Sequence, residues 1–290
     1  MESTAPPRAD STLPGAESLV ALLSAETAAS FTADAWPTAP LVVAGSVTRL
    51  HGLADYDVEA LIAMDKSHTT ASLRTLDGVL KSIRVKADQE AGLHSAGATL
   101  AFHRLASPGL RRWGAALERD LRLVEGMIRV NAAASRRAEG FEPRFSTEDQ
   151  FVCQTRGTQR WRIGMNPEDA FVEPASPRTI DLEPGTVVFL PRGTWHAAEA
   201  TGNETLQVTV QPGLATLREV LEYVLLTSNA LQRRELGGPI LRMFEGEKTR
   251  AGVDDKVRSA LRDLVDGICT GELAISPDGL RKYLRARRVS

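Results

Sequence analysis

The sequence predicts a mainly β protein, a barrel or a sandwich, followed by a helical region. Between residues 127 and 210, short apolar segments alternate with Gly and Pro, a pattern typical of strands joined by tight turns. After Pro212 the apolar residues recur at helical spacing instead. The 290 residues, 42% of them hydrophobic and 25% charged, are enough for one large domain and one small one.

The N-terminal part is predicted to mix helices with a few strands. A tail rich in Pro, Ala and Ser comes first, and we expect it to be flexible. Three segments then carry apolar side chains at helical spacing, and others are short and apolar or contain a central Asp-Gly turn. The expected helices are residues 19–31, 55–64 and 108–121, and the expected strands are residues 41–44, the hairpin 69–85 and residues 97–103.

The barrel itself is predicted from the segments that follow residue 127. Pro184-Gly185 forms a tight turn between two of them, and Pro191 and Gly193 turn the chain again before Trp195 and His196 begin another strand. The expected strands are residues 127–131, 150–154, 160–163, 179–182, 186–190 and 206–210.

Residues 213–290 are predicted to form helices at 217–231, 254–269 and 278–288. The domain prediction is therefore a tail (1–17), a barrel with N-terminal helices (18–212) and a helical region (213–290). The apolar stripes of these helices favour a homodimer, although they could also pack on the barrel. The basic cluster in residues 281–288 is typical of a solvated helix end.

Composition narrows the classes of function. The net charge of −2 gives no basic bias, so we do not expect a nucleic-acid partner. No apolar stretch reaches the length of a membrane helix, and the N-terminus lacks the pattern of a signal peptide. The two cysteines, Cys153 and Cys269, are far apart in the sequence and fit a reducing compartment, so we expect a cytoplasmic protein.

Two segments carry a motif. Residues 151–161, FVCQTRGTQRW, combine an aromatic residue, an apolar pair and Gln with a later Gly and Trp. Residues 182–196, LEPGTVVFLPRGTWH, contain two turns and end in Trp-His. Together they resemble the JmjC-type cupins, in particular the ribosomal-oxygenase branch of the 2-oxoglutarate oxygenases, although Thr186 replaces the usual Asp.

The resemblance implies a double-stranded β-helix and a set of site residues. In the family, an Fe(II) ion and 2-oxoglutarate support hydroxylation of a peptide or protein side chain, and the position of His196 supplies the third iron ligand. Without the motif, His196 would be interpreted as a hydrogen-bonded histidine in the mouth of a barrel. The helical C-terminus is similar to the dimerising helices of the ribosomal oxygenases.

The pattern departs from the family at the other two iron ligands. The resemblance puts Arg144 at the histidine position and Ser146 at the carboxylate position, so the facial triad that suits Fe(II) is reduced to His196. A guanidinium stays protonated at ordinary pH and would repel a dication. We therefore expect no metal and no cofactor.

The expected cosubstrate site is altered as well. Gln159 stands where family members use Lys or Arg to hold 2-oxoglutarate, and it supplies no charge. Its neighbour Arg160 is expected to face the opposite side of the strand. Asn131 matches a family asparagine near the cosubstrate, and a strand-end cap is an equally good interpretation of it.

Three functional hypotheses remain open. In the first, a pseudo-oxygenase binds a peptide, a protein or a small anionic ligand in a pocket lined by Asn131, Arg144, Ser146, Gln159 and His196, unless Arg144 forms a structural ion pair with Glu148 or Asp149.

In the second, Glu142, Glu148 or Asp149 rebuilds a metal site with His196, and the protein hydroxylates a peptide or protein side chain with Fe(II) and 2-oxoglutarate. In the third, His196 is a general base in metal-free chemistry, but no second catalytic group stands at a recognisable spacing. Cys153 could face the lumen and is expected to be inert.

Overall fold

The computed structural model describes residues 18–29, 31, 37–64, 68–75, 77, 79–86, 88–121, 123, 125–136, 138–213 and 217–227, with residues 262, 266, 267, 279, 280, 282 and 283. The chain divides into two compact units, residues 1–213 and 214–290. The expected tail, residues 1–17, lies outside the described residues.

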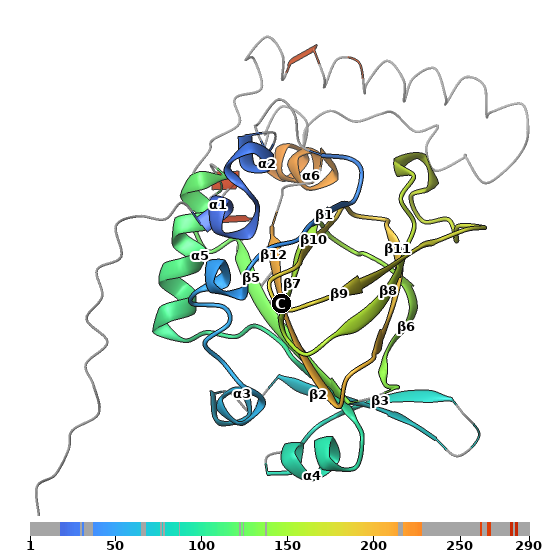
Figure 1. Ribbon diagram of the computed structural model, residues 1–290. Helices are drawn as coiled ribbons and strands as arrows, with labels where there is room; N and C mark the ends of the chain where they lie inside the picture. The colour runs from blue at the N-terminus through green and yellow to red at the C-terminus, as the bar shows by residue number, and fades with distance from the viewer. Residues whose placement is uncertain are drawn as a thin grey trace, which may run out of the picture. The chain divides into compact units, whose positions relative to one another are not determined.

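The first unit is a double-stranded β-helix (Figure 1). Antiparallel strands form a larger sheet with the order β1-β10-β7-β12-β5-β4-β2-β3 and a smaller sheet with the order β6-β11-β8-β9. The strands are β1 (Leu41–Val43), β2 (Thr69–Arg74), β3 (Leu80–Arg84), β4 (Thr99–Phe102), β5 (Ile128–Arg136), β6 (Gly140–Phe145), β7 (Gln150–Arg156), β8 (Gln159–Ile163), β9 (Arg178–Leu182), β10 (Val187–Leu190), β11 (Trp195–Ala200) and β12 (Glu204–Pro212). The mainly β prediction is confirmed.

Helices precede and interrupt the strands, and short polar side chains cap their N-termini. Ser107 accepts a hydrogen bond from the amide of Leu110, with Pro108 in the first helical position, and Asp57 accepts one from Ala60. The helices are α1 (Ser18–Leu22), α2 (Ala25–Ala29), α3 (Val58–Met64), α4 (Glu90–Ser95), α5 (Pro108–Asp120) and α6 (Leu217–Thr227), and the 3-10 helices are η1 (Val47–Leu50) and η2 (Pro167–Asp169).

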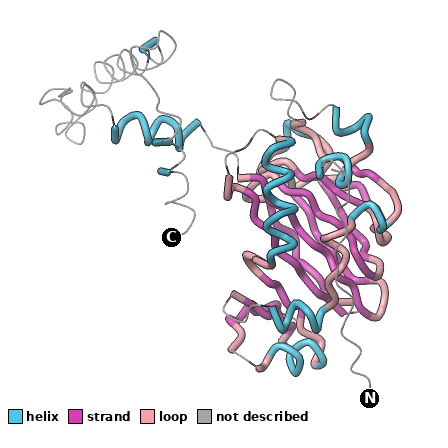
Figure 2. Tube along the Cα trace, turned by 90° about the vertical axis from the view of Figure 1, so that its left-hand side faces the viewer, coloured by secondary structure: helices cyan, strands magenta, loops and turns pink. Residues whose placement is uncertain are grey.

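Alternation along the strands separates two cores. One face of the larger sheet packs Phe151, Phe189 and their neighbours against Leu22 of α1 and Leu117 of α5. The other face lines the barrel lumen, where Val152, Val188 and Leu190 meet Trp161 and Ile163 of the smaller sheet. The helices α1 and α5 thus lie on the side of the barrel away from β8 and β11 (Figures 1 and 2). A one-residue shift in a strand would exchange these two faces.

Arg49 joins three segments that are distant in the sequence. Its guanidinium donates hydrogen bonds to the carbonyl oxygens of Leu22 (3.0 Å), Val43 (2.8 Å) and Gly185 (2.7 Å). Burial lowers the pKa of Arg49, but a guanidinium with such a partner set stays protonated. Gly185 has a φ of +96°, and a Cβ there would lie 2.1 Å from the carbonyl oxygen of Gly45, so the predicted turn requires glycine.

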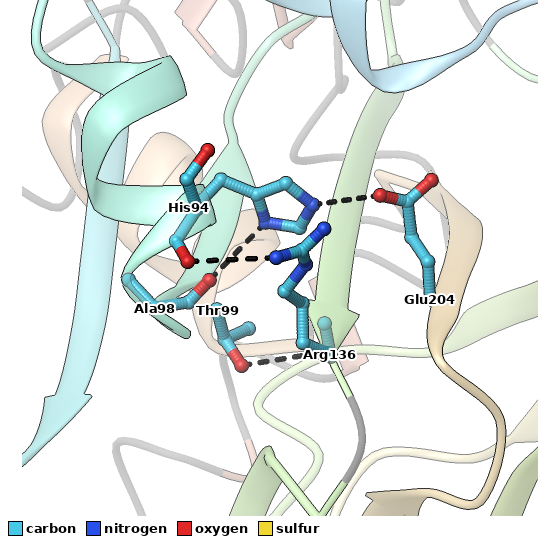
Figure 3. Close-up of polar contacts among 7 residues, drawn as sticks. His94, Ala98, Thr99, Arg136 and Glu204 are labelled. Atoms are coloured by element: carbon cyan, nitrogen blue, oxygen red, sulfur yellow. Dashed lines mark hydrogen bonds and ion pairs between the residues drawn. The ribbon is translucent and has the colours of Figure 1, made fainter.

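Helix α4 is held to the ends of two strands by a polar cluster (Figure 3). His94 Nε2 lies 3.0 Å from a carboxylate oxygen of Glu204 on β12, and His94 Nδ1 lies 3.3 Å from the carbonyl oxygen of Ala98. Arg136 of β5 donates to the carbonyl oxygen of Ser95 at 3.4 Å. Both ring nitrogens of His94 therefore lie within hydrogen-bonding distance of oxygen atoms on other segments.

Some predicted elements were wrong or missing. The single helix expected at residues 19–31 is two short helices, because the chain breaks at Ser24, whose hydroxyl accepts from the amide of Thr27. Neither α4 nor β6 was predicted. β6 has no clear alternation of polar and apolar residues, since it lies at an edge of the smaller sheet and includes Pro143. Cys153 was expected to be able to face the lumen, but it packs in the core between the larger sheet and the helices, and burial raises its pKa to about 12.

The second unit is described over a short part of its length. α6 is described from Leu217 to Thr227, and the rest of the helix expected at 217–231 lies outside the described residues, as do most of the helices expected at 254–269 and 278–288. Within this unit Tyr223 packs against Tyr283, and the Tyr283 hydroxyl donates to Glu222. The homodimer therefore stays a prediction. None of the described helices is long and apolar enough to cross a membrane.

We predict that Arg49→Met lowers the free energy of unfolding by about 3 kcal/mol, because three carbonyl oxygens lose a charged donor and the methionine can replace only the packing. Urea unfolding followed by circular dichroism measures the change. Arg84→Met, on the exposed strand β3, is the matched control and should change stability by less than about 0.5 kcal/mol. Equal effects of the two substitutions would contradict the role assigned to Arg49.

Candidate functional site

The candidate site is a cavity of about 310 Å³ within the barrel. Its volume lies at the lower end of the range of about 300–1,000 Å³ that is usual for small-molecule sites. The lining includes Arg144, two histidines, four side-chain amides and three hydroxyl groups, but no carboxylate. The cavity is therefore polar, and its only side chain with a permanent charge is a cation.

The pairing of β6 with β11 brings the two central residues together. Arg144 lies opposite His196 in the register, and both side chains line the cavity. The register shifts between His196 and Ala198, where β11 is irregular. Gly140 permits the close approach at the start of β6, because a Cβ at this position would lie 2.1 Å from the carbonyl oxygen of Ala198.

His196 is buried, and its contacts assign its protonation state. Arg144 Nε donates a hydrogen bond to His196 Nε2 at 3.4 Å, so Nε2 must present its lone pair. His196 Nδ1 lies 3.2 Å from the carbonyl oxygen of Thr194 and therefore carries the proton. Burial, reinforced by the charge of Arg144 and opposed by the Thr194 contact, lowers the pKa of His196 to about 4. Trp161 stacks on the ring at 5.5 Å and fixes its plane.

Arg144 has no carboxylate partner in the described part of the chain. Its guanidinium lies over the ring of Phe141 at 4.1 Å. The predicted alternative was an ion pair with Glu148 or Asp149, but Glu148 pairs with Arg129, and Asp149 accepts a hydrogen bond from the amide of Arg192. Burial lowers the pKa of Arg144, yet the group stays charged because its ordinary pKa is so high.

Of the other predicted site residues, Asn131 and Ser146 line the cavity and Gln159 does not. Gln159 is fully buried on β8, where its Oε1 accepts a hydrogen bond from the indole of Trp161 at 2.9 Å. Trp161 in turn stacks on His196, so Gln159 lies behind it rather than at the cavity. Arg160 points outward and pairs with Asp181, as strand alternation predicts.

Several residues that line the cavity were not predicted from the sequence. His103, Gln150, Gln207 and Gln211 all face the cavity. The signal for two of them was present: Gln207 and Gln211 alternate with Leu206, Val208 and Val210 along β12, which gives one polar and one apolar face. A segment with apolar residues on its core face and amides on the other predicts a polar lumen.

The residues present do not fit the iron centre that the resemblance implies. The Nε2 lone pair that would hold a metal ion accepts the Nε–H of Arg144 instead. Ser146 supplies a neutral hydroxyl in place of a carboxylate, and the described residues contain no group of three His, Cys, Asp or Glu side chains that could hold a metal ion. A cation bound at His196 would also be repelled by the guanidinium.

The carboxylates proposed for a rebuilt site are engaged elsewhere. Glu142 lies in a hollow on the outer face of the smaller sheet, 3.5 Å from Arg74. Glu148 and Asp149 have the partners described above. None of the three lines the cavity that contains His196.

Comparison with known proteins agrees with this fold. Residues 114–220 match the family model of the JmjC domain. This segment is therefore similar to a JmjC domain. It contains Asn131, Arg144, Ser146, Gln159 and His196, so the substitutions at the iron positions lie inside the matched segment.

Three known proteins are similar to this chain in sequence or in structure. YxbC of Bacillus subtilis, an uncharacterized protein, is 24% identical over 220 residues, which cover 63% of this chain and 67% of YxbC. The bifunctional lysine-specific demethylase and histidyl-hydroxylase NO66 of Drosophila willistoni is 34% identical over 109 residues, 31% of this chain and 14% of NO66. The Escherichia coli ribosomal oxygenase YcfD, in complex with cobalt and succinic acid, has a TM-score of 0.51 at 20% identity over 84% of this chain.

The resemblance to JmjC proteins of the ribosomal-oxygenase kind is thus confirmed. The alignments span 65% of the YcfD chain and 14% of NO66, and the structural likeness at this identity shows the fold alone. YcfD has also been solved in complex with cobalt and 2-oxoglutarate.

We predict that His196 stays neutral, with the proton on Nδ1, from pH 8 down to about 5 and titrates near pH 4. Arg144→Gln should raise the pKa because a repelling charge is removed. The pKa of a histidine in an unfolded chain is about 6.5. Between about pH 6.5 and 4, His196 therefore binds a proton in the unfolded chain but not in the folded protein. As a result, the contribution of His196 lowers the free energy of unfolding as the pH falls through this range.

The measurement is a titration of protein with ¹⁵N-labelled histidine by nuclear magnetic resonance. Arg160→Gln, on the outer face of β8, is the control and should leave the pKa of His196 unchanged. A His196 pKa near 6.5, or a proton on Nε2, would contradict the assigned contact with Arg144.

Proposed function

We propose that this protein is a JmjC-fold binding protein that holds an anionic group in its barrel cavity and does not use iron chemistry. The supporting observation is the acid-free lining around Arg144: a cation at the cavity with no carboxylate partner among the described residues. Arg144 uses its Nε–H on His196, so its two terminal nitrogens remain for a ligand. A guanidinium matches a carboxylate or phosphate group by paired hydrogen bonds.

The size of the cavity limits the ligand. About 310 Å³ accommodates a small organic anion, or one acidic side chain of a peptide or protein inserted into the barrel. The relatives named as a ribosomal oxygenase and a histidyl-hydroxylase favour a peptide or protein partner by analogy alone.

An outer hollow offers more arginines but is a weaker candidate. It measures about 380 Å³ and includes Arg74 of β2 with Arg160 and Arg162 of β8, besides the carboxylates of Glu142 and Glu199. Arg162 lies over the ring of Trp195 at 5.6 Å. Arg160 is 2.9 Å from Asp181, and Arg74 is 3.5 Å from Glu142, so both guanidinium groups already face carboxylates. An exposed cation with a partner gains little from a second anion.

We predict that succinate binds the protein and that succinamide, its neutral counterpart of similar shape, binds at least about tenfold more weakly, because only the carboxylate forms a charged pair with Arg144. Isothermal titration calorimetry measures both, with inorganic phosphate as a second probe. Arg144→Gln should weaken succinate binding by about tenfold or more, whereas Arg160→Gln should leave it unchanged. Equal binding of succinate and succinamide, or a loss confined to Arg160→Gln, would refute the proposed site.

The competing function is an Fe(II)- and 2-oxoglutarate-dependent hydroxylase, which the JmjC match favours. We predict that protein reconstituted anaerobically with Fe(II) and desalted retains iron far below a stoichiometric amount in elemental mass spectrometry, and that His196→Ala changes nothing. The double substitution Arg144→His with Ser146→Asp is the positive control, because it supplies two histidines and a carboxylate at the implied ligand positions. Stoichiometric iron that depends on His196 in the unmodified protein would overturn the proposal.

A further inference from the structure

The cavity wall contains a chain of hydrogen bonds whose direction is fixed at one end. The amide of Arg104 donates to Asn131 Oδ1 at 2.9 Å, which turns Asn131 Nδ2 towards Gln211. A main-chain N–H can only donate, so the orientation of the Asn131 amide is not free. This contact is the anchor of the chain.

The orientation of each following side-chain amide is set by its hydrogen bond to the preceding side-chain amide. Asn131 Nδ2 donates to Gln211 Oε1 at 2.8 Å, and Gln211 Nε2 donates to Gln150 Oε1 at 3.3 Å. Gln150 Nε2 then donates to Ser146 Oγ at 3.1 Å. Reversing any one amide would place two donors or two acceptors face to face, so the chain runs one way, from β5 through β12 and β7 to Ser146.

The direction of this series of hydrogen bonds determines whether the Ser146 hydroxyl can donate to a ligand. Its oxygen accepts from Gln150, so its own proton needs an acceptor. The neighbouring His196 Nδ1, 3.5 Å away, already carries a proton, because Arg144 Nε–H occupies the other ring nitrogen. No other acceptor for the Ser146 hydroxyl exists among the described residues. Ser146 is buried and lines the cavity, so its proton is available to a ligand there.

We infer that Ser146 donates its hydroxyl proton to the anion held by Arg144, and that Gln150 sets this polarity. The inference rests on the proposed function and narrows it: the ligand atom that meets Ser146 is a hydrogen-bond acceptor, such as an oxygen of an ionised carboxylate or a phosphate, and not a donor such as an amide N–H or the O–H of a protonated acid. Gln150 is thus a positioning residue that determines specificity, because it acts on the ligand through Ser146.

The test is a double-mutant cycle with succinate as the probe. Ser146→Ala should weaken binding by about tenfold, the scale of one hydrogen bond to a charged group. In Gln150→Glu, the new carboxylate accepts from both Gln211 and Ser146, so the serine proton turns away from the cavity. Ser146→Ala added to Gln150→Glu should then weaken binding by less than about twofold further.

A control separates polarity from charge. Thr147→Glu adds the same negative charge at the cavity wall, next to Ser146 but outside the chain of amides. It should weaken succinate binding by repulsion yet leave the tenfold effect of Ser146→Ala intact. An equal effect of Ser146→Ala in the Gln150→Glu and Thr147→Glu backgrounds would refute the polarity argument.

The outcomes also distinguish this inference from the proposed function. Succinate binding that requires Arg144 but is unaffected by Ser146→Ala would refute the donor role and leave the anion site in place. Absence of succinate and phosphate binding in the unmodified protein would refute the anion site, and the donor role with it. Circular dichroism of each variant verifies that the barrel is folded.

Discussion

The site depends on one contact, the hydrogen bond from Arg144 to His196 Nε2. The register of β6 and β11 places these two residues opposite each other, and the guanidinium then occupies the lone pair that a metal ion would need. The same contact assigns the tautomer of His196, because the remaining ring nitrogen must donate to Thr194. With an arginine at position 144, the nitrogen at the implied ligand position of His196 becomes a hydrogen-bond acceptor.

The polar lumen is supported by an apolar scaffold that the substitutions leave intact. Trp161 stacks on His196, and the inner core of Val152, Val188 and Leu190 closes the lumen on the side of the larger sheet. Arg49 ties the turn at Gly185 to α1 and β1 by hydrogen bonds to main-chain carbonyls. These residues hold the fold and do not reach the cavity, which explains how a JmjC domain can keep its architecture while the chemistry of its site differs.

A cavity lined by amides and hydroxyls presents a problem of orientation, because each such group can donate or accept. Here the hydrogen bond from the main-chain amide of Arg104 fixes the orientation of the Asn131 side-chain amide. Successive hydrogen bonds then fix the orientations of Gln211, Gln150 and Ser146. Preorganised donors bind an acceptor without the cost of turning them first. Together with the charge of Arg144, this arrangement favours a fully ionised group.

The sequence by itself determined the β-barrel class and the two turns around Gly185 and Gly193, because turn chemistry and strand alternation are local. The departure from the usual ligand types at Arg144 and Ser146 was implied by the resemblance to the JmjC family. It did not determine that Gln159 lies behind Trp161, that Glu148 pairs with Arg129, or that Gln150 and Gln211 line the same cavity as Arg144. Those relations join strands that are far apart in the chain. Only the tertiary structure sets the register between such strands, and the register decides which side chains share the cavity.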